Sequence, residues 1–166
     1  RAGDRWIGGH TITTCQLSTC LEKVPAAQRD ASPLPPPRAG RKRGVGIVAL
    51  THISGLMGTS ASVHMRGDGT FTLNTGCVDI GQGSDTIMTQ LCAGVLKVPV
   101  ERIAYSAQDS DLSPYNWKTA GSRSTYMTGR AVVAATKDVE TKILAHAAEM
   151  FECAAAAIAR FFSPEK

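Results

Sequence analysis

The feature that most limits how this 166-residue chain can fold is an alternation of apolar and polar residues that runs through a glycine turn into a helical repeat. The alternation covers residues 61–66 and again residues 70–75, and Gly67-Asp68-Gly69 separates the two runs. A period of two predicts β-strands, and glycines supply the positive φ angles of a tight turn between them. We therefore expect an antiparallel hairpin whose second strand runs on through residues 76–80 into Gly81-Gln82-Gly83.

A helix is predicted directly after this glycine turn. Apolar residues recur at helical spacing up to Pro99, which ends the pattern; they are Ile87, Met88, Leu91, Cys92, Val95 and Leu96. Ser84 or Asp85 is expected to cap this helix. Residues 102–107 then return as a strand.

A second, long helix is predicted from about Ser124 by a stripe with a period close to 3.6 residues. The stripe consists of Val132, Val133, Val139, Ile143, Leu144, Ala147, Ala148 and Phe151. The predicted fold class is therefore α+β. It combines a β-hairpin and mixed sheet, a strand–glycine turn–helix–strand unit and a long C-terminal helix.

The N-terminal quarter differs in character from the rest of the chain. Residues 1–31 carry one weak helical pattern, in Leu17, Cys20, Leu21 and Val24, and this helix is predicted to end before Pro25. Residues 32–43 are rich in proline and arginine and are predicted to form a linker.

Two further segments complete the predicted organisation. Residues 44–152 are expected to form the folded domain, with its sheet beginning in the strand-like run Val45–Leu50 between glycines. Residues 153–166 form a tail that matches no recognised pattern.

The net charge of +4 lies entirely in the first quarter of the chain. Residues 1–43 hold eight Lys and Arg against three Asp and Glu, whereas residues 44–166 hold ten against eleven. The basic cluster at 38–43 fits either a nucleic-acid arm or a solvated connector. We favour the connector and expect no nucleic-acid partner, because the rest of the chain shows no basic face with interleaved aromatics.

Cysteine, histidine and apolar-run patterns point to a reduced, cytoplasmic protein. The five cysteines form no C-x-x-C pair and the four histidines are scattered, so no local zinc or iron–sulfur site is expected. The longest apolar runs, Val45–Leu50 and Cys153–Ala159, are far shorter than the roughly 18 to 20 residues that span a bilayer. We expect no membrane association.

Two polar loops stand at predicted helix starts. Gly81-Gln82-Gly83 either makes only the turn or lets the backbone approach an anionic cofactor at the helix N-terminus. The glutamine favours a ligand role, since its amide both donates and accepts hydrogen bonds. Gly121-Ser122-Arg123-Ser124 is either an N-cap cluster with a surface arginine or a site for an anion or polar heterocycle.

Several ordered motifs resemble the molybdenum-binding large subunit of the xanthine dehydrogenase, or molybdenum hydroxylase, family. They are Val78-Asp79-Ile80-Gly81-Gln82-Gly83-Ser84-Asp85-Thr86, Leu96-Lys97-Val98-Pro99, Gln108-Asp109-Ser110-Asp111, Pro114-Tyr115-Asn116-Trp117 and Gly121-Ser122-Arg123-Ser124-Thr125-Tyr126. The resemblance is closest to 4-hydroxybenzoyl-CoA reductase and aldehyde oxidoreductase-like members and covers roughly residues 1–152. Lys97 stands where the family usually has glycine, which costs a helix C-cap.

The resemblance implies a molybdopterin cofactor, in its cytosine dinucleotide or a related pyranopterin form. It implies hydroxylation of a heterocycle or aldehyde with oxygen from water, or reduction of an aromatic acyl-CoA. It places Gln82 beside molybdenum, hydrogen-bonded to an oxygen ligand, with Gly81 and Gly83 letting the backbone reach the cofactor. By the same resemblance, Gly121, Ser122, Arg123 and Ser124 contact the pterin or phosphate region, and no residue of this chain binds the metal directly.

The catalytic glutamate that the family supplies in a later segment is not found here, so no catalytic residue is expected in this chain. One hypothesis is that the chain is the molybdenum-binding portion of an oxidoreductase acting on a small molecule. Its partners would be the rest of its large subunit and the iron–sulfur and flavin (FAD) subunits or domains. The other is a non-catalytic α+β assembly module. Under both, we expect the 166 residues alone to be inactive.

Overall fold

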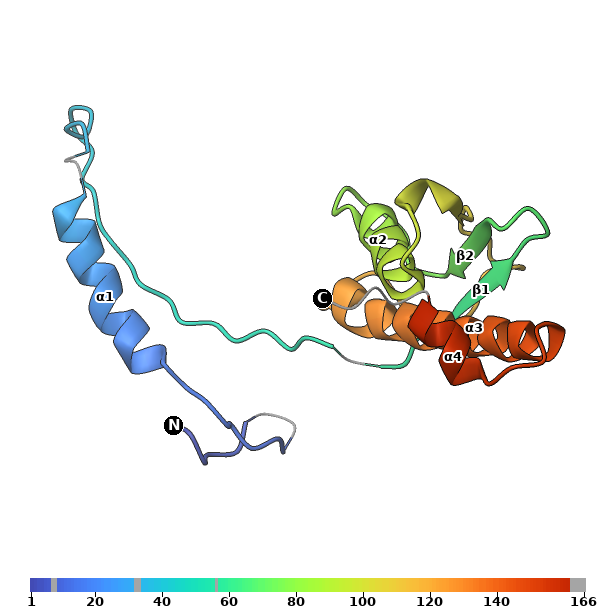
Figure 1. Cartoon of the computed structure of the whole chain (residues 1–166). Helices are drawn as coiled ribbons and strands as arrows, with labels where there is room; N and C mark the ends of the chain where they lie inside the picture. Colours follow the sequence, from blue (N-terminus) through green and yellow to red (C-terminus); the bar gives the residue numbers. More distant parts are fainter. Residues whose placement is uncertain (7–8, 32–33, 56, 162–166) are drawn as a thin grey trace. The chain divides into compact units, whose positions relative to one another are not determined.

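The computed structural model describes residues 1–6, 9–31, 34–55 and 57–161. The chain divides into two units, Arg1–Thr51 and His52–Lys166, each with its own elements (Figure 1). Positions 32–33 of the expected linker and 162–166 of the expected tail lie outside the described residues. Within the described ranges, no helix combines the length and the apolar character needed to cross a membrane.

Among its described residues, the N-terminal unit contains one helix, α1 (Leu17–Asp30), in which no residue is buried. The prediction that this helix ends before Pro25 is wrong, because α1 continues through the proline. Proline has no N–H for the carbonyl four residues earlier. The residues after it, Ala26-Ala27-Gln28, are strong helix formers, so the helix resumes.

The strand expected over Val45–Leu50 does not form either. Its side chains are exposed, Val45 by 65% and Val48 by 84%. A strand gains stability from a neighbour that pairs its N–H and C=O groups, and the glycines at 44 and 46 add backbone freedom that weakens it further. The sheet therefore begins at Ala61.

The C-terminal unit is built on a mixed sheet of three strands in the order β1 (Ala61–Met65), β2 (Phe71–Thr75) and β3 (Ile103–Tyr105). β1 pairs with β2 in antiparallel register, with Val63 opposite Leu73, and the predicted hairpin is confirmed. β2 pairs with β3 in parallel, with Phe71 opposite Ile103. The prediction of a mixed sheet is therefore confirmed.

β2 ends at Thr75, so the prediction that it runs on to residue 80 is wrong. From Gly76 the chain meets another loop so closely that a Cβ there would lie 2.6 Å from the Pro114 carbonyl oxygen. The backbone of Gly76 bonds to a side chain of that loop instead of a neighbouring strand, since Asn116 Nδ2 donates to the Gly76 carbonyl at 2.9 Å.

The parallel connection between β2 and β3 runs through α2 (Ser84–Leu96) and the short 3₁₀ turn η1 (Val100–Arg102). The chain continues through a loop into the π-helical turn η2 (Ser124–Thr128), α3 (Gly129–Met150) and α4 (Ala155–Phe161). The long C-terminal helix predicted from Ser124 is confirmed, with its first turn widened into a π-turn.

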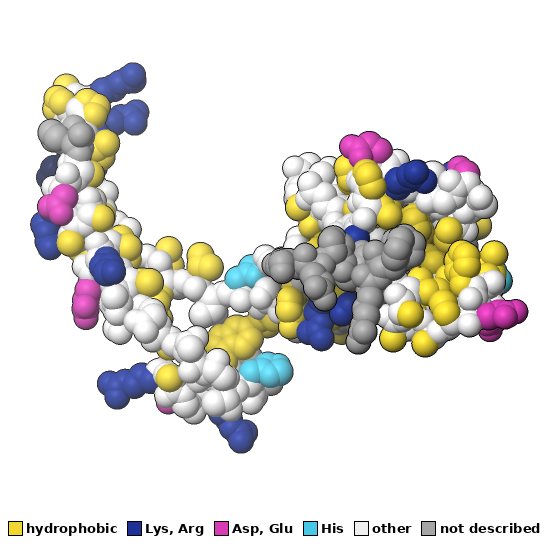
Figure 2. Space-filling model, in the orientation of Figure 1, with side chains coloured by type: hydrophobic (Ala, Val, Ile, Leu, Met, Phe, Trp, Pro, Cys, Tyr) yellow, Lys and Arg dark blue, Asp and Glu magenta, His cyan; other side chains and the backbone are white. Residues whose placement is uncertain are grey.

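The core lies where α2 and α3 pack on one face of the sheet (Figure 1). Leu73 from β2, Met88 and Cys92 from α2, and Val132 from α3 are fully buried there. α2 approaches the start of α3 so closely that a Cβ at Gly129 would lie 2.9 Å from a methyl carbon of Leu91. Hydrophobic side chains also reach the surface, as Figure 2 shows for both units.

Candidate functional site

The glycine turn before α2 is made by two residues with positive φ, Gly81 at 103° and Gly83 at 74°. A Cβ added at either glycine would meet no atom within 4 Å, so the turn leaves open space beside its backbone. A side chain at either position would strain the backbone and fill that space. The turn therefore offers a close approach to a ligand.

The carboxylate of Asp79 holds the turn in this conformation. Its Oδ1 accepts from the Gly81 N–H at 2.8 Å and the Gly83 N–H at 3.4 Å, and its Oδ2 accepts from the Asp85 N–H at 3.3 Å. These bonds, chiefly the one from Gly81, lower the pKa of Asp79 below its ordinary value because they stabilise the charged form.

This arrangement corrects the prediction that Ser84 or Asp85 caps the helix. The N-cap residue is Gly83, and the N–H groups at the helix start bond to Asp79 instead. The sequence-based expectation of unpaired N–H groups facing an anion is also corrected, since a carboxylate of this chain already compensates the positive end of the helix. What the turn offers is an open backbone surface rather than a ready anion site.

The side chain of Gln82 folds over the turn. Its Oε1 accepts from the Ile80 N–H at 2.6 Å, and its Nε2 donates to the Val78 carbonyl at 3.0 Å and to Ser84 Oγ at 3.0 Å. Gln82 is nevertheless exposed. Its amide therefore stabilises the turn and lies at the surface beside the open glycines.

Asp85, one turn further on, has a half-buried carboxyl group. Burial raises its pKa above the ordinary value, and the negative charge of Asp79 raises it further. Gln108 Nε2 donates to Asp85 Oδ1 at 3.5 Å, which partly opposes these effects. Two carboxyl groups with opposite pKa shifts thus stand at the start of α2.

The second predicted loop also has positive φ angles, 73° at Gly121 and 47° at Ser122. Arg123, expected as a ligand contact or a surface residue, is 1% exposed. Its guanidinium donates to acceptors within the protein, among them Asn116 Oδ1 at 2.6 Å and the carbonyls of Lys118 at 2.9 Å, Met57 at 3.2 Å and Gly58 at 2.9 Å. The surface-arginine alternative is therefore wrong. The guanidinium ties the loop to the segment before β1.

The two predicted loops are linked through residues 116–119, which sequence reasoning did not single out as functional. Asn116 bonds both to Arg123 and to the Gly76 carbonyl, and Thr119 Oγ1 accepts from the Val78 N–H at 3.0 Å. The only feature of the sequence that pointed to Asn116 was its place within a family motif. Asp79 carried a clearer signal, because an Asp two residues before a glycine favours an Asx-turn.

Of the residues predicted for the second loop, Ser122 lines a groove of about 700 Å³ beside the π-turn and α3. Tyr126 and Arg130 also line the groove, and the Arg130 guanidinium lies 5.7 Å from the Tyr126 ring centre. Gly81, Gln82 and Gly83 do not line this groove. The two loops are therefore linked through residues 116–119, but the glycine turn does not share the groove that Ser122 lines.

No cluster of three or more His, Cys, Asp or Glu residues suited to holding a metal occurs in the part of the chain that the structure describes. The open glycine turn with an amide beside it suits a bulky, polar group. Arg123 does not fit as a direct contact, because its donors face acceptors of the protein itself.

Comparison with known proteins identifies relatives of this chain. A family model described as a molybdopterin cofactor-binding domain matches residues 19–163. The putative xanthine dehydrogenase molybdenum-binding subunit of Escherichia coli (strain K12) is 31% identical over 151 residues, which cover 86% of this chain and 20% of that protein. The nicotine 6-hydroxylase large subunit of Paenarthrobacter nicotinovorans is 31% identical over 69% of this chain and 16% of its own length.

Solved structures agree in fold. Aldehyde oxidoreductase from Desulfovibrio gigas superimposes with a TM-score of 0.60 and 28% identity over 83% of this chain and 16% of that chain. The chain thus spans about a fifth or less of the length of these relatives. The family match also reaches into the tail 153–166, for which the sequence showed no resemblance.

Proposed function

This chain belongs to the molybdopterin cofactor-binding domain family, and on that premise we propose that its Gly81–Gly83 turn borders the cofactor of a molybdenum hydroxylase type oxidoreductase. The observation that carries the proposal is the turn itself. Two glycines with positive φ leave open space beside the backbone, and Asp79 holds them in place. When bound, the cofactor supplies the redox chemistry of the reaction.

The role we assign to Gln82 is to orient the cofactor with its amide. In its present position the amide Nε2 has Ser84 Oγ as one of two acceptors, at 3.0 Å. Exchange of that acceptor for a cofactor atom would leave the Oε1 bond to Ile80 and the backbone of the turn in place. Gly81 and Gly83 would admit the cofactor to the backbone, as a Cβ could not.

We assign two tasks to the residues of the second loop. Gly121, Ser122 and Ser124 are proposed to border the pterin or phosphate region of the cofactor, and Ser122 is the exposed member. Arg123 is proposed as a positioning residue, since hydrogen bonds to Asn116, Lys118, Met57 and Gly58 hold its guanidinium inside the protein. It would act on the cofactor only through the loop that it fixes.

The remaining proposals concern the whole protein. We propose that the cofactor is the cytosine dinucleotide form of molybdopterin or a related pyranopterin. We propose that the rest of the large subunit completes the site and that iron–sulfur and flavin groups lie on partner subunits or domains. The relatives named as a molybdenum-binding subunit and a large subunit support an assembly of this kind. A small organic molecule is the proposed substrate, and the cytoplasm the proposed location.

A second candidate function is a non-catalytic assembly module that binds no cofactor by itself. It is favoured by Asp79 and Arg123, whose polar groups are engaged within the chain rather than directed at a ligand. Elemental analysis separates the two: molybdenum in the complete protein supports the oxidoreductase, and its absence from the purified, intact protein supports the module.

Gln82→Ala in the complete enzyme tests the site. Loss of a hydrogen bond that orients a metal-bound group typically costs about 10- to 100-fold in affinity or activity. We expect molybdenum content or turnover to fall by that factor while the melting temperature changes little, since Asp79 and the glycines still form the turn. Gln82→Glu, which keeps the acceptor for Ile80 and loses the donor, is expected to show a similar loss.

The matched control is Gln90→Ala, because Gln90 is an exposed glutamine on α2 outside the turn. This variant is expected to keep full molybdenum content and turnover. Full molybdenum content together with full turnover in Gln82→Ala would show that the glutamine serves the turn alone, and the proposed site would be wrong.

A further inference from the structure

β1 forms one edge of the three-stranded sheet, and its register shows which of its backbone groups point outward. Beside the turn, the Arg66 N–H donates to the Thr70 carbonyl at 2.8 Å, so residues 66 and 70 form a hydrogen-bonded pair. Hydrogen-bonded pairs and pairs without hydrogen bonds alternate along an antiparallel ladder. Ser62 and His64 therefore bond to β2, whereas Ala61, Val63 and Met65 direct their N–H and C=O groups away from it.

The opposite strand supports this assignment independently. Leu73 is the partner of Val63, and its carbonyl accepts from the Ser106 N–H at 2.8 Å on the β3 side. In a pair that is not hydrogen-bonded, both residues point outward, one to each side of the ladder. The outward groups of β2 are thus used by β3, and those of β1 lie on the edge.

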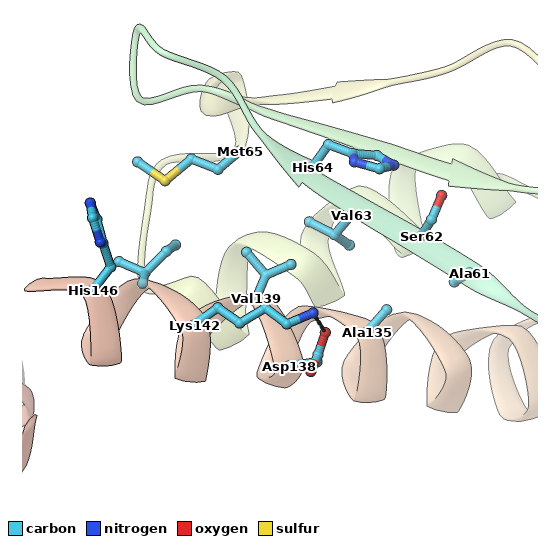
Figure 3. Close-up of a pocket in the computed structure, with 11 residues that line it drawn as sticks. Ala61, Ser62, Val63, His64, Met65, Ala135, Asp138, Val139, Lys142 and His146 are labelled. Carbon is cyan, nitrogen blue, oxygen red and sulfur yellow. Dashed lines mark hydrogen bonds and ion pairs between the residues drawn. The ribbon is translucent and has the colours of Figure 1, made fainter.

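α3 extends beyond this edge and forms the floor of a groove of about 540 Å³ (Figure 3). Val63 and Val139 face one another across it, while Ser62 and His64 point to the other side of the sheet. Along the rim, Lys142 Nζ bonds Asp138 Oδ2 at 2.6 Å, so two of the rim charges neutralise each other. The floor of the groove is apolar, this part of its rim is close to neutral in charge, and an open strand edge lines one side.

We propose that an extended strand from the rest of the large subunit lies in this groove and continues the sheet at β1. Its backbone would pair with Ala61, Val63 and Met65, and its apolar side chains, at every second position, would pack on Val139 and its neighbours on α3. The proposal rests on the proposed function, in which this chain is part of a larger subunit. That subunit supplies the occupant, since the chain spans only 20% of the length of its Escherichia coli relative.

The physical reason to expect a strand in this groove is that an open strand edge is unfavourable. A strand edge that is neither charged nor covered promotes aggregation, and proteins usually pair or shield it. Here the edge strand ends at Met65, which is 52% exposed, and the apolar side of α3 lies beside the strand. A strand of the same subunit would cover both without a second copy of the chain.

Hydrogen exchange of the intact large subunit tests the pairing at single residues. The Ser62 and His64 amides are protected by β2 and serve as internal references, and Asp68 in the hairpin turn serves as the exposed reference. We expect the Val63 and Met65 amides to exchange roughly 100-fold more slowly than Asp68, as the references in β1 do. Exchange of Val63 and Met65 at the rate of Asp68 would overturn the proposal.

A photoreactive methionine analogue at position 65 identifies the occupant. A cross-link to a segment of the subunit outside residues 1–166 is the expected result. Cross-links confined to residues 1–166, with none to a segment outside them, or a cross-link to a second copy in a product of doubled mass, would overturn the proposal. The molybdenum content of the same sample is measured in parallel. Protected amides without molybdenum would leave the strand in place and refute the proposed function, and molybdenum with unprotected amides would do the reverse.

Discussion

Helices α1 and α3 each carry an apolar stripe, yet they lie in units with very different interiors. Leu21 and Val24 of α1 remain 42% and 50% exposed, whereas Val132 of α3 is fully buried against β2 and α2. A helical pattern specifies which side of a helix is apolar, and it does not supply the surface that covers that side. Helix formation and burial therefore have separate origins in this chain.

The largest expected difference between the two units is in their susceptibility to proteases. Residues 34–51 are exposed and form no helix or strand, so cleavage there requires no unfolding. Trypsin is expected to cut the chain within Arg38–Arg43 first, at least about 100-fold faster than at Arg123, which is 1% exposed. Mass spectrometry of early fragments measures this order, and early cleavage in the C-terminal unit with an intact 38–43 segment would contradict it.

A matched pair of leucine truncations measures the difference between the interiors of the two units. Leu73→Ala removes a fully buried side chain from β2 and is expected to lower the free energy of unfolding by about 2–5 kcal/mol. Leu21→Ala in α1 is expected to change it by about 0.5 kcal/mol or less. Urea denaturation followed by circular dichroism measures both. Equal effects of the two changes would mean that α1 is also part of a packed core.

The smallest expected effect concerns how the helices end. Lys97 follows α2 with a φ of 55°, a left-handed conformation that costs a residue with a Cβ about 1 kcal/mol. Lys97→Gly is therefore expected to stabilise the C-terminal unit by about 0.5–1 kcal/mol. Ala31 follows α1 with a φ of −68°, so Ala31→Gly relieves no strain and is the control. A gain from both substitutions, or from neither, in thermal denaturation would refute this explanation.

Prediction from sequence succeeded where the pattern is local and dense. The alternation over 61–66 and 70–75 predicted the hairpin, and the repeat from Ile87 to Leu96 predicted α2. Prediction failed where an interaction came from a distant segment. The end of β2 at Thr75 depends on Pro114 and Asn116, about forty residues away in the sequence, and no pattern near Gly76 reports them.

The candidate site shows the same division. Sequence motifs singled out the glycine turn and the Gly121–Ser124 loop, and the positive φ angles agree with their glycines. The partners of Arg123 could not be predicted, because its acceptors at Met57, Gly58 and Asn116 come together only in the folded chain. An exposed arginine and a buried, hydrogen-bonded arginine look alike in the sequence, since the acceptors around the guanidinium decide whether its charge can be buried.

By itself, the sequence of this protein determined its family, its α+β class and the order of hairpin, helix, strand and long helix in the C-terminal unit. The family follows from the resemblance of its ordered motifs, whereas the class and the order of elements follow from periodicity and from glycine and proline positions, which act over a few residues at a time. Only the tertiary structure decided that Val45–Leu50 does not pair, that Asp79 rather than Ser84 or Asp85 satisfies the start of α2, and that Arg123 is buried. The physical reason is that pairing, capping and burial each need a second group, and in a folded chain that group can come from any distance along the sequence.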